Sequence, residues 1–174
     1  GSLDEALRSF NELREQSQTR YQNAQLDEIT GHIALCFKHL YEKNKTKDYL
    51  EKMQGEIDNG MRLDVSEGRK AVFFLRQADI YSYHESWAQA NSTVLHAYQL
   101  VCNGKNPGYM KGEYLGHYAE SVSNNGRSVE SMRLFADAIK LVKADKEIEA
   151  SYRCIILSGI YAKMIIPCIK ARYV

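Results

Sequence analysis

Apolar residues recur along this chain three and four positions apart, the spacing that places them on one face of an α-helix. No segment alternates apolar and polar residues for long, and only two prolines occur, so helix is favoured over strand. The expected helices cover residues 3–17, 20–42 and 46–58, a stretch from behind Asp64 to His84, then 87–101, a stretch ended by Asn124, 129–141, and a last segment from about Lys146.

These helices come in pairs that repeat about every 41 residues. In the expected second helices, the large apolar residues Met53, Val94 and Phe135 are separated by 41 positions, and Phe10 precedes Met53 by 43. The expected first helices keep the same spacing at Phe37, Ala78 and Ala119. Helix pairs that repeat at a fixed period indicate an α-solenoid, in which each pair buries its apolar face against its neighbours.

The unit resembles the tetratricopeptide repeat. Between Leu115 and Ala138 the chain has that repeat's order of a bulky opening residue, a small residue, a turn glycine at Gly126 and a large apolar residue at Phe135. Trp87 and Ala90 hold similar places in the preceding unit. A period of 41 is longer than the usual period of about 34, so each pair has roughly two extra helical turns.

The period predicts an all-α fold, a right-handed α-solenoid of about four antiparallel helix pairs similar to tetratricopeptide units. An unrelated helical bundle is the alternative. We expect residues 3–174 to form one helical-repeat domain, a fragment of a longer chain, and Gly1-Ser2 to be the remnant of an expression tag.

Local signals predict how individual helices begin and end. The run Asp64-Val65-Ser66-Glu67 reads as a capping box in which Asp64 accepts a hydrogen bond from the backbone of Glu67. Pro167 is expected to kink or end the last helix. The apolar run from Cys154 to Ile169 is interrupted by polar residues and is expected to be too short to span a bilayer.

Charge and cysteine content narrow the function classes. The 174 residues include 23 basic and 22 acidic side chains scattered along the chain, for a net charge of +1. The sequence therefore lacks the one-signed field that nucleic acid or an anionic membrane would need, and neither is expected as a direct partner. The four cysteines have unrelated spacings, and three lie in apolar helical pattern. This favours buried, reduced thiols in an intracellular protein of the cytoplasm or nucleus.

Candidate catalytic and metal-binding groups are few. His32, Cys36 and His39 share one side of a helix, which could present three metal ligands, but a buried thiol between two surface histidines is the preferred interpretation. No glycine elbow accompanies a cysteine or serine nucleophile, and no phosphate-binding glycine loop follows a strand. The sequence predicts no enzyme, no metal and no cofactor.

Longer helical repeats of this kind are similar to the arms of PCI-domain scaffold subunits, found in the proteasome lid and the COP9 signalosome. The similarity is carried by Leu63–Glu67, Asn106–Lys111 and Glu149–Ser158. It implies an elongated, non-catalytic arm that docks neighbouring subunits, although the family's winged helix is missing before Val174. A bacterial peptide-sensing regulator built from tetratricopeptide repeats is the alternative family.

If the units stack as tetratricopeptide repeats do, polar first-helix residues line an inner groove. The expected groove residues are Lys38, Tyr41, Asp79, Ser82, Tyr83, Glu120, Ser123 and Asn124. Their mixture of both charges with hydroxyl groups suits an extended or helical peptide and not a lipid, although simple solvation is the alternative. The sequence therefore predicts a non-enzymatic protein–protein scaffold whose partners are other subunits or a peptide segment, with a peptide-sensing regulator as the second hypothesis.

Overall fold

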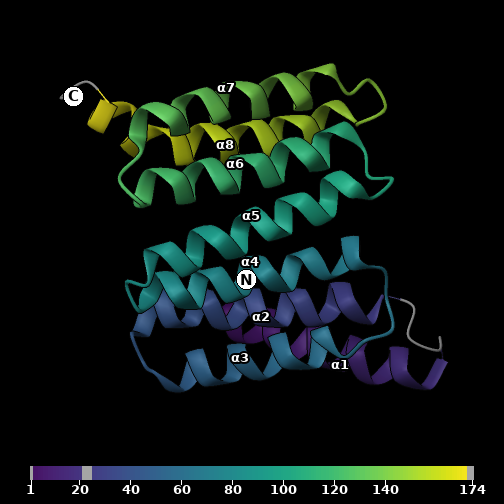
Figure 1. Ribbon diagram of the computed structural model, residues 1–174. Coiled ribbons are helices and arrows are strands. Elements are labelled where there is room, and N and C mark those ends of the chain that lie inside the picture. The colour runs from purple at the N-terminus through teal and green to yellow at the C-terminus, as the bar shows by residue number, and fades with distance from the viewer. Residues whose placement is uncertain (1, 21–24, 172–174) are drawn as a thin grey trace.

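The protein is described by a computed structural model over residues 2–20 and 25–171, and within these ranges every regular element is an α-helix (Figure 1). The prediction of an all-α chain is confirmed. The helices are α1 (Leu3–Arg20), α2 (Leu26–Asn44), α3 (Asp48–Met61), α4 (Glu67–Tyr83), α5 (Trp87–Asn103), α6 (Gly108–Asn124), α7 (Ser128–Ala144) and α8 (Ala150–Ala171).

The period of 41 residues is also the spacing of helix bounds. The pair α6–α7 begins and ends each of its helices 41 positions after the pair α4–α5, and α2 begins 41 positions before α4. The regularity is lost at both ends of the chain. Helix α3 has only 14 residues, and α8 begins 42 positions after α6.

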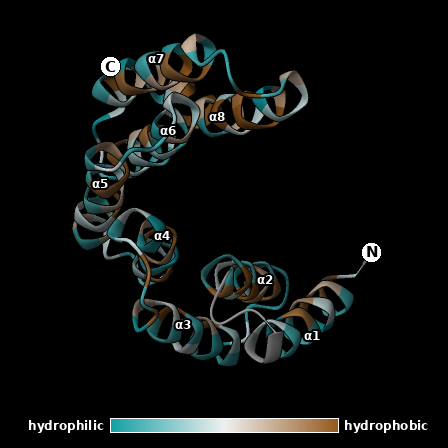
Figure 2. Cartoon of the chain, turned by 90° about the vertical axis from the view of Figure 1, so that its right-hand side faces the viewer, coloured by the Kyte–Doolittle hydropathy of each residue, from teal (hydrophilic) through white to brown (hydrophobic). Residues whose placement is uncertain are grey.

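Each helix from α1 to α8 packs on the next one along the chain, and α2 and α6 also contact α4 and α8, respectively. Figure 2 shows the resulting stack as an arc that is open on one side. Helices α2, α4, α6 and α8 lie towards its inner side, and α3, α5 and α7 lie towards its outer side. Helix α6 packs closely on α5 but makes at most marginal contact with the backbone of α4, so the inner helices separate at this point.

The core follows the predicted repeat in the middle of the stack and departs from it at the N-terminal end. Met53 and Phe135 are fully buried and Val94 is nearly so, whereas Phe10 is only half-buried. Leu13, about one helical turn after Phe10, is 48% exposed. Helix α1 packs mainly against α2 and contacts α3 through the ion pair of Arg14 with Glu56, so its apolar face is only partly covered.

Helices α6 and α7 approach closely at a glycine. A Cβ atom at Gly112 would lie 2.7 Å from the carbonyl oxygen of Ala138 and 2.6 Å from Cγ2 of Val142. These distances are shorter than van der Waals contact, so a side chain here would push the two helices apart. The hydrogen atom of glycine is what allows this helix pair to close.

The helix start predicted at Asp64 is wrong. Helix α4 is capped by Ser66 in an extended conformation, with no side-chain hydrogen bond, so the capping box predicted at Asp64 does not form. A reciprocal capping box is found instead at α1, where Ser2 Oγ accepts from the Glu5 backbone at 3.2 Å and Glu5 accepts from the Ser2 backbone at 2.9 Å. Ser2, one of the two residues expected to be a tag remnant, is thus the cap of α1. The other, Gly1, lies outside the described residues.

Helix α8 runs through Pro167 to Ala171, so the proline does not end it. The ring removes only one backbone donor, and only one further helical turn follows. Within the described ranges, residues 150–170 of α8 form the single stretch long and apolar enough to cross a membrane by length and composition, and only 17% of that stretch is buried. The expectation that this run is too short to span a bilayer is therefore wrong on length. Its outward face carries Ile155, Ile165, Ile166 and Ile169, each more than half exposed.

The close approach at Gly112 predicts opposite effects for two glycine-to-alanine changes inside helices. Gly112→Ala should destabilise the protein by about 1–3 kcal/mol, because the new methyl group meets backbone and Val142. Gly55→Ala in α3 meets nothing within 4 Å and should stabilise the protein by about 0.5–1 kcal/mol through helix propensity. Urea unfolding of both variants measures the difference, and a stabilising Gly112→Ala would contradict the account.

Candidate functional site

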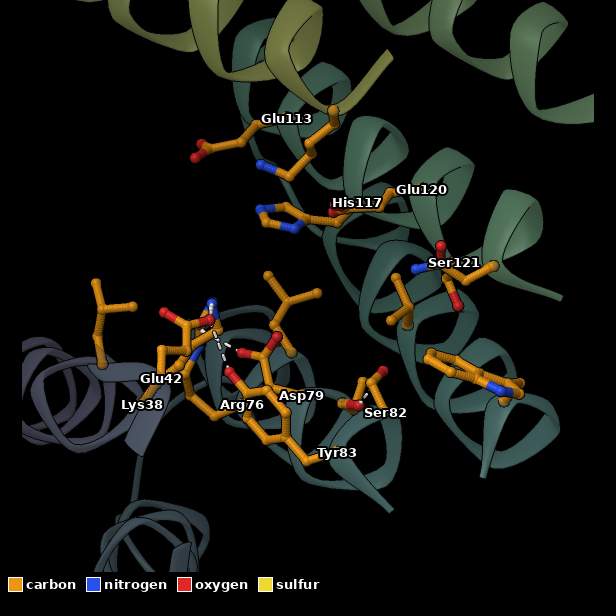
Figure 3. Close-up of a pocket in the computed structure, with 17 residues that line it drawn as sticks. Lys38, Glu42, Arg76, Asp79, Ser82, Tyr83, Glu113, His117, Glu120 and Ser121 are labelled. Carbon is orange, nitrogen blue, oxygen red and sulfur yellow. Dashed lines mark hydrogen bonds and ion pairs between the residues drawn. The ribbon is translucent and has the colours of Figure 1, made fainter. Parts of the chain in front are cut away.

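A cavity of about 600 Å³ lies on the inner side of the arc where the inner helices separate. Residues of α2 and α4 form one wall and residues of α6 and α8 form the other, as Figure 3 shows for the first three helices. A second cavity of about 330 Å³ adjoins it and shares five lining residues, which are Leu35, Leu75, Arg76, Glu113 and His117. Because the two cavities share these residues, we refer to them together as the groove.

The groove residues fall into columns one repeat apart. Because α2, α4 and α6 begin 41 positions apart, residues separated by 41 hold equivalent places on successive inner helices. The three columns that line the larger cavity are Leu35, Arg76 and His117; Lys38, Asp79 and Glu120; and Glu42, Tyr83 and Asn124. The repeat thus determines which side chains face each other across the groove.

Glu42 is the centre of a hydrogen-bond cluster on the first wall. It accepts from Tyr83 Oη at 2.7 Å, pairs with Lys38 Nζ at 2.9 Å, and contacts His39 Nδ1 at 2.9 Å. Burial opposes ionisation of Glu42, but the hydrogen bonds from Lys38, Tyr83 and His39 outweigh it and lower its pKa to about 2. Burial and the bond to Glu42 raise the pKa of Tyr83, so its hydroxyl stays protonated and acts as a donor.

Arg76 and Asp79 form the second charge pair of this wall. Arg76 Nη1 lies 3.0 Å from Asp79 Oδ2, one turn further along α4, and Arg76 is only 9% exposed. Burial raises the pKa of Asp79, and the charges of Arg76 and Lys38 act in the opposite direction. The two side chains thus form an ion pair within α4, although Arg76 Nε and Asp79 Oδ2 are buried without a hydrogen-bond partner in the part of the chain that the structure describes.

The second wall differs because its titratable groups line the cavity without a hydrogen bond or an ion pair to any described residue. Glu113, His117 and Glu120 lie on one stripe of α6, and Lys163 comes from α8 (Figure 3 labels the first three). Burial raises the pKa of both glutamates, and the nearby charge of Lys163 acts in the opposite direction on each. Burial lowers the pKa of His117 well below its usual value, and Lys163 adds to this, so the imidazole is neutral at pH 7.

Six of the eight groove residues predicted from the sequence line this cavity: Lys38, Asp79, Ser82, Tyr83, Glu120 and Asn124. Tyr41 does not line it but packs against Tyr83, with 4.7 Å between ring centroids. Ser123 is 2% exposed and faces the protein interior, because it follows the buried Val122 on the packed side of α6. The binding role of these residues stays a prediction.

Several lining residues were missed by the sequence analysis. Arg76 and His117 belong to the 41-residue column that starts at the apolar Leu35, and extending that column would have found them. Glu113 is preceded in its column by Gly31 and Val72, which gave no polar signal. Lys163 could not have been found from the period, because α8 begins one residue out of register.

The described residues offer no group of three histidine, cysteine or acidic side chains able to hold a metal ion. Cys36 is buried, with its pKa raised by burial, and His32 and His39 are exposed, as the preferred interpretation of this trio had it. The wider expectation of buried thiols is wrong for Cys154 and Cys168, which are exposed because α8 is covered on one side only.

No protein-family model matches the chain, and no curated protein resembles it in sequence beyond the level expected by chance. Function is therefore inferred from the groove and its chemistry.

The Glu42 cluster predicts a pH-dependent contribution to stability. Tyr83→Phe keeps the ring against Tyr41 and removes the hydroxyl that donates to Glu42, so the pKa of Glu42 should rise from about 2. A carboxyl with a lowered pKa in the folded state stabilises above its unfolded pKa, and this stabilisation is lost as the pH falls through the folded value. The variant should lose about 0.5–1 kcal/mol near pH 7, since the pair is partly exposed, and the loss should shrink towards pH 2.

Urea unfolding at a series of pH values measures this difference. Tyr161→Phe is the matched control, because Tyr161 is 46% exposed on α8 and is far from the cluster in sequence. A Tyr83→Phe loss that stayed constant from pH 7 to pH 2 would show that the hydroxyl does not act through Glu42.

Proposed function

We propose that the protein is a non-enzymatic protein–protein interaction scaffold whose inner groove binds a peptide segment of another subunit. The single observation that carries this proposal is the groove between the inner helices, lined by charged and hydroxyl side chains of both walls. Peptides bound in such grooves are held by side-chain hydrogen bonds and ion pairs at several points.

We further propose that the stack is a right-handed α-solenoid of tetratricopeptide-like pairs. The spacing of 41 residues between helix bounds supports this, as does the order in which each helix contacts the next. In such a solenoid the first helix of each pair lines the inner surface, which agrees with the even-numbered helices found there (Figure 2).

The similarity to PCI-domain arms suggests the kind of assembly in which such a groove would act. An arm of this type docks neighbouring subunits of a multisubunit complex in the cytoplasm or nucleus. The partly uncovered faces of α1 and α8 at the two ends of the stack are compatible with contacts to further protein.

A peptide-sensing regulator is the second candidate, and the position of the cavity favours it. The two walls are joined mainly through α5, because α4 and α6 do not pack closely. A ligand that contacts both walls would bind more tightly to one curvature of the arc than to another, and would thereby shift the population between curvatures.

Site-specific photo-crosslinking tests the groove as the binding surface. A photo-reactive phenylalanine analogue at Asn124 lies in the groove, whereas the same residue at Lys140 of α7 lies on the outer side, where the Lys140 side chain is 78% exposed. In an extract of the source cells, we expect discrete protein adducts from position 124 and not from position 140. Adducts of equal yield from both positions, or none from either, would contradict binding in the groove.

A further inference from the structure

Two carboxylates in the groove make no hydrogen bond or ion pair with the described residues, and they point to the class of segment that the groove accepts. Glu113 and Glu120 flank His117 on α6, at spacings of four and three residues that bring all three onto one face. Among the described residues, neither glutamate makes a hydrogen bond or an ion pair within 4 Å. Burial raises the pKa of each, and the charge of Lys163 only partly offsets this. An incoming cation would offset this desolvation.

The other charges of the groove are already committed. Lys38 pairs with Glu42, and Arg76 pairs with Asp79. At the far end of the groove, Arg69 donates from Nε and Nη2 to the two carboxylate oxygens of Asp27, each at 2.6 Å. These pairs partly neutralise the cations and so weaken their attraction for an acidic ligand. Among the described residues that line the groove, Lys163 is then the one cation without an ion pair. Two carboxylates, those of Glu113 and Glu120, also lack an ion pair.

The charge of the groove differs in sign from that of the chain. The two adjoining cavities are lined by six carboxylates and four cationic side chains, while the whole chain carries a net charge of +1. His117 does not restore the balance, because it is neutral at pH 7. The groove is thus an acidic strip on a weakly basic protein, and it would attract a basic segment over an acidic one.

We propose that the groove accepts a basic peptide segment, and that a lysine or arginine side chain of this segment pairs with Glu113 and Glu120. This inference rests on the proposed function, since it names the chemistry of the peptide that the scaffold binds. The backbone of the segment lies along the inner helices, and its cation enters the cavity between the two walls. The neutral imidazole of His117 can accept a hydrogen bond from the same cationic group.

The test is selection of a random dodecapeptide phage library on the protein, followed by affinity measurements on the selected peptides. We expect the selected peptides to be enriched in lysine and arginine. The double variant Glu113→Gln and Glu120→Gln should weaken their binding by at least about tenfold, because it removes two charge-assisted contacts. The variant should melt no lower than the parent, since it removes two half-buried carboxylates whose ionised form is disfavoured by burial. Each single variant is measured as well, in case the double variant fails to fold.

The matched control is Glu51→Gln with Glu147→Gln, which removes the same net charge from two exposed positions outside the groove and should change affinity less than about twofold. One outcome is that binding of the selected peptides is lost with Asn124→Ala although the peptides are not basic or are insensitive to the glutamate variants. That result would overturn this inference and leave groove binding intact. Peptides insensitive to every groove substitution, or no selected peptide at all, would overturn both proposals.

Discussion

Close approach of the paired helices is the constraint on which the rest of this structure depends. Small residues occupy the buried contact faces of α4–α5 and α6–α7, and they include Ala78, Ala97, Gly112 and Ala138. Small side chains let two helices interlock at short distance, and the distance is then difficult to change without a steric clash. Each pair is therefore a stiff unit of fixed length, and repeating that unit gives the spacing of 41 residues.

The fixed unit places side chains one repeat apart next to each other on the inner surface. The bond from Tyr83 to Glu42 spans 41 positions and the pair of Arg69 with Asp27 spans 42. Both connect α2 to α4, one near each end of the two helices. A change in the length of α2 or α4 would move Tyr83 away from Glu42 and Arg69 away from Asp27. The spacing of the buried apolar residues therefore also determines the polar contacts of the groove.

The sequence alone predicted the helices, the period and most of one face of the groove, since these depend on local periodicity. It identified Lys38, Asp79 and Glu120 because they share one column. It could not identify Lys163, whose place depends on how α8 crosses α6 out of register, or foresee that Ser123 turns inward. It also overstated the burial of Cys154 and Cys168, because coverage of a helix face depends on neighbours that no local pattern reports.

The groove exists where the stacking of inner helices is interrupted. Helices α2 and α4 are in contact and satisfy each other's charges, and α6 and α8 are also in contact. Between α4 and α6 the arc opens, so the columns that join Arg76 to His117 and Asp79 to Glu120 are separated by the cavity (Figure 3). Arg76 and Asp79 pair within their own helix, whereas Glu113 and Glu120 find no cation on theirs. The unpaired charge of the second wall thus follows from the curvature, and the same opening that leaves it unpaired admits a segment able to neutralise it.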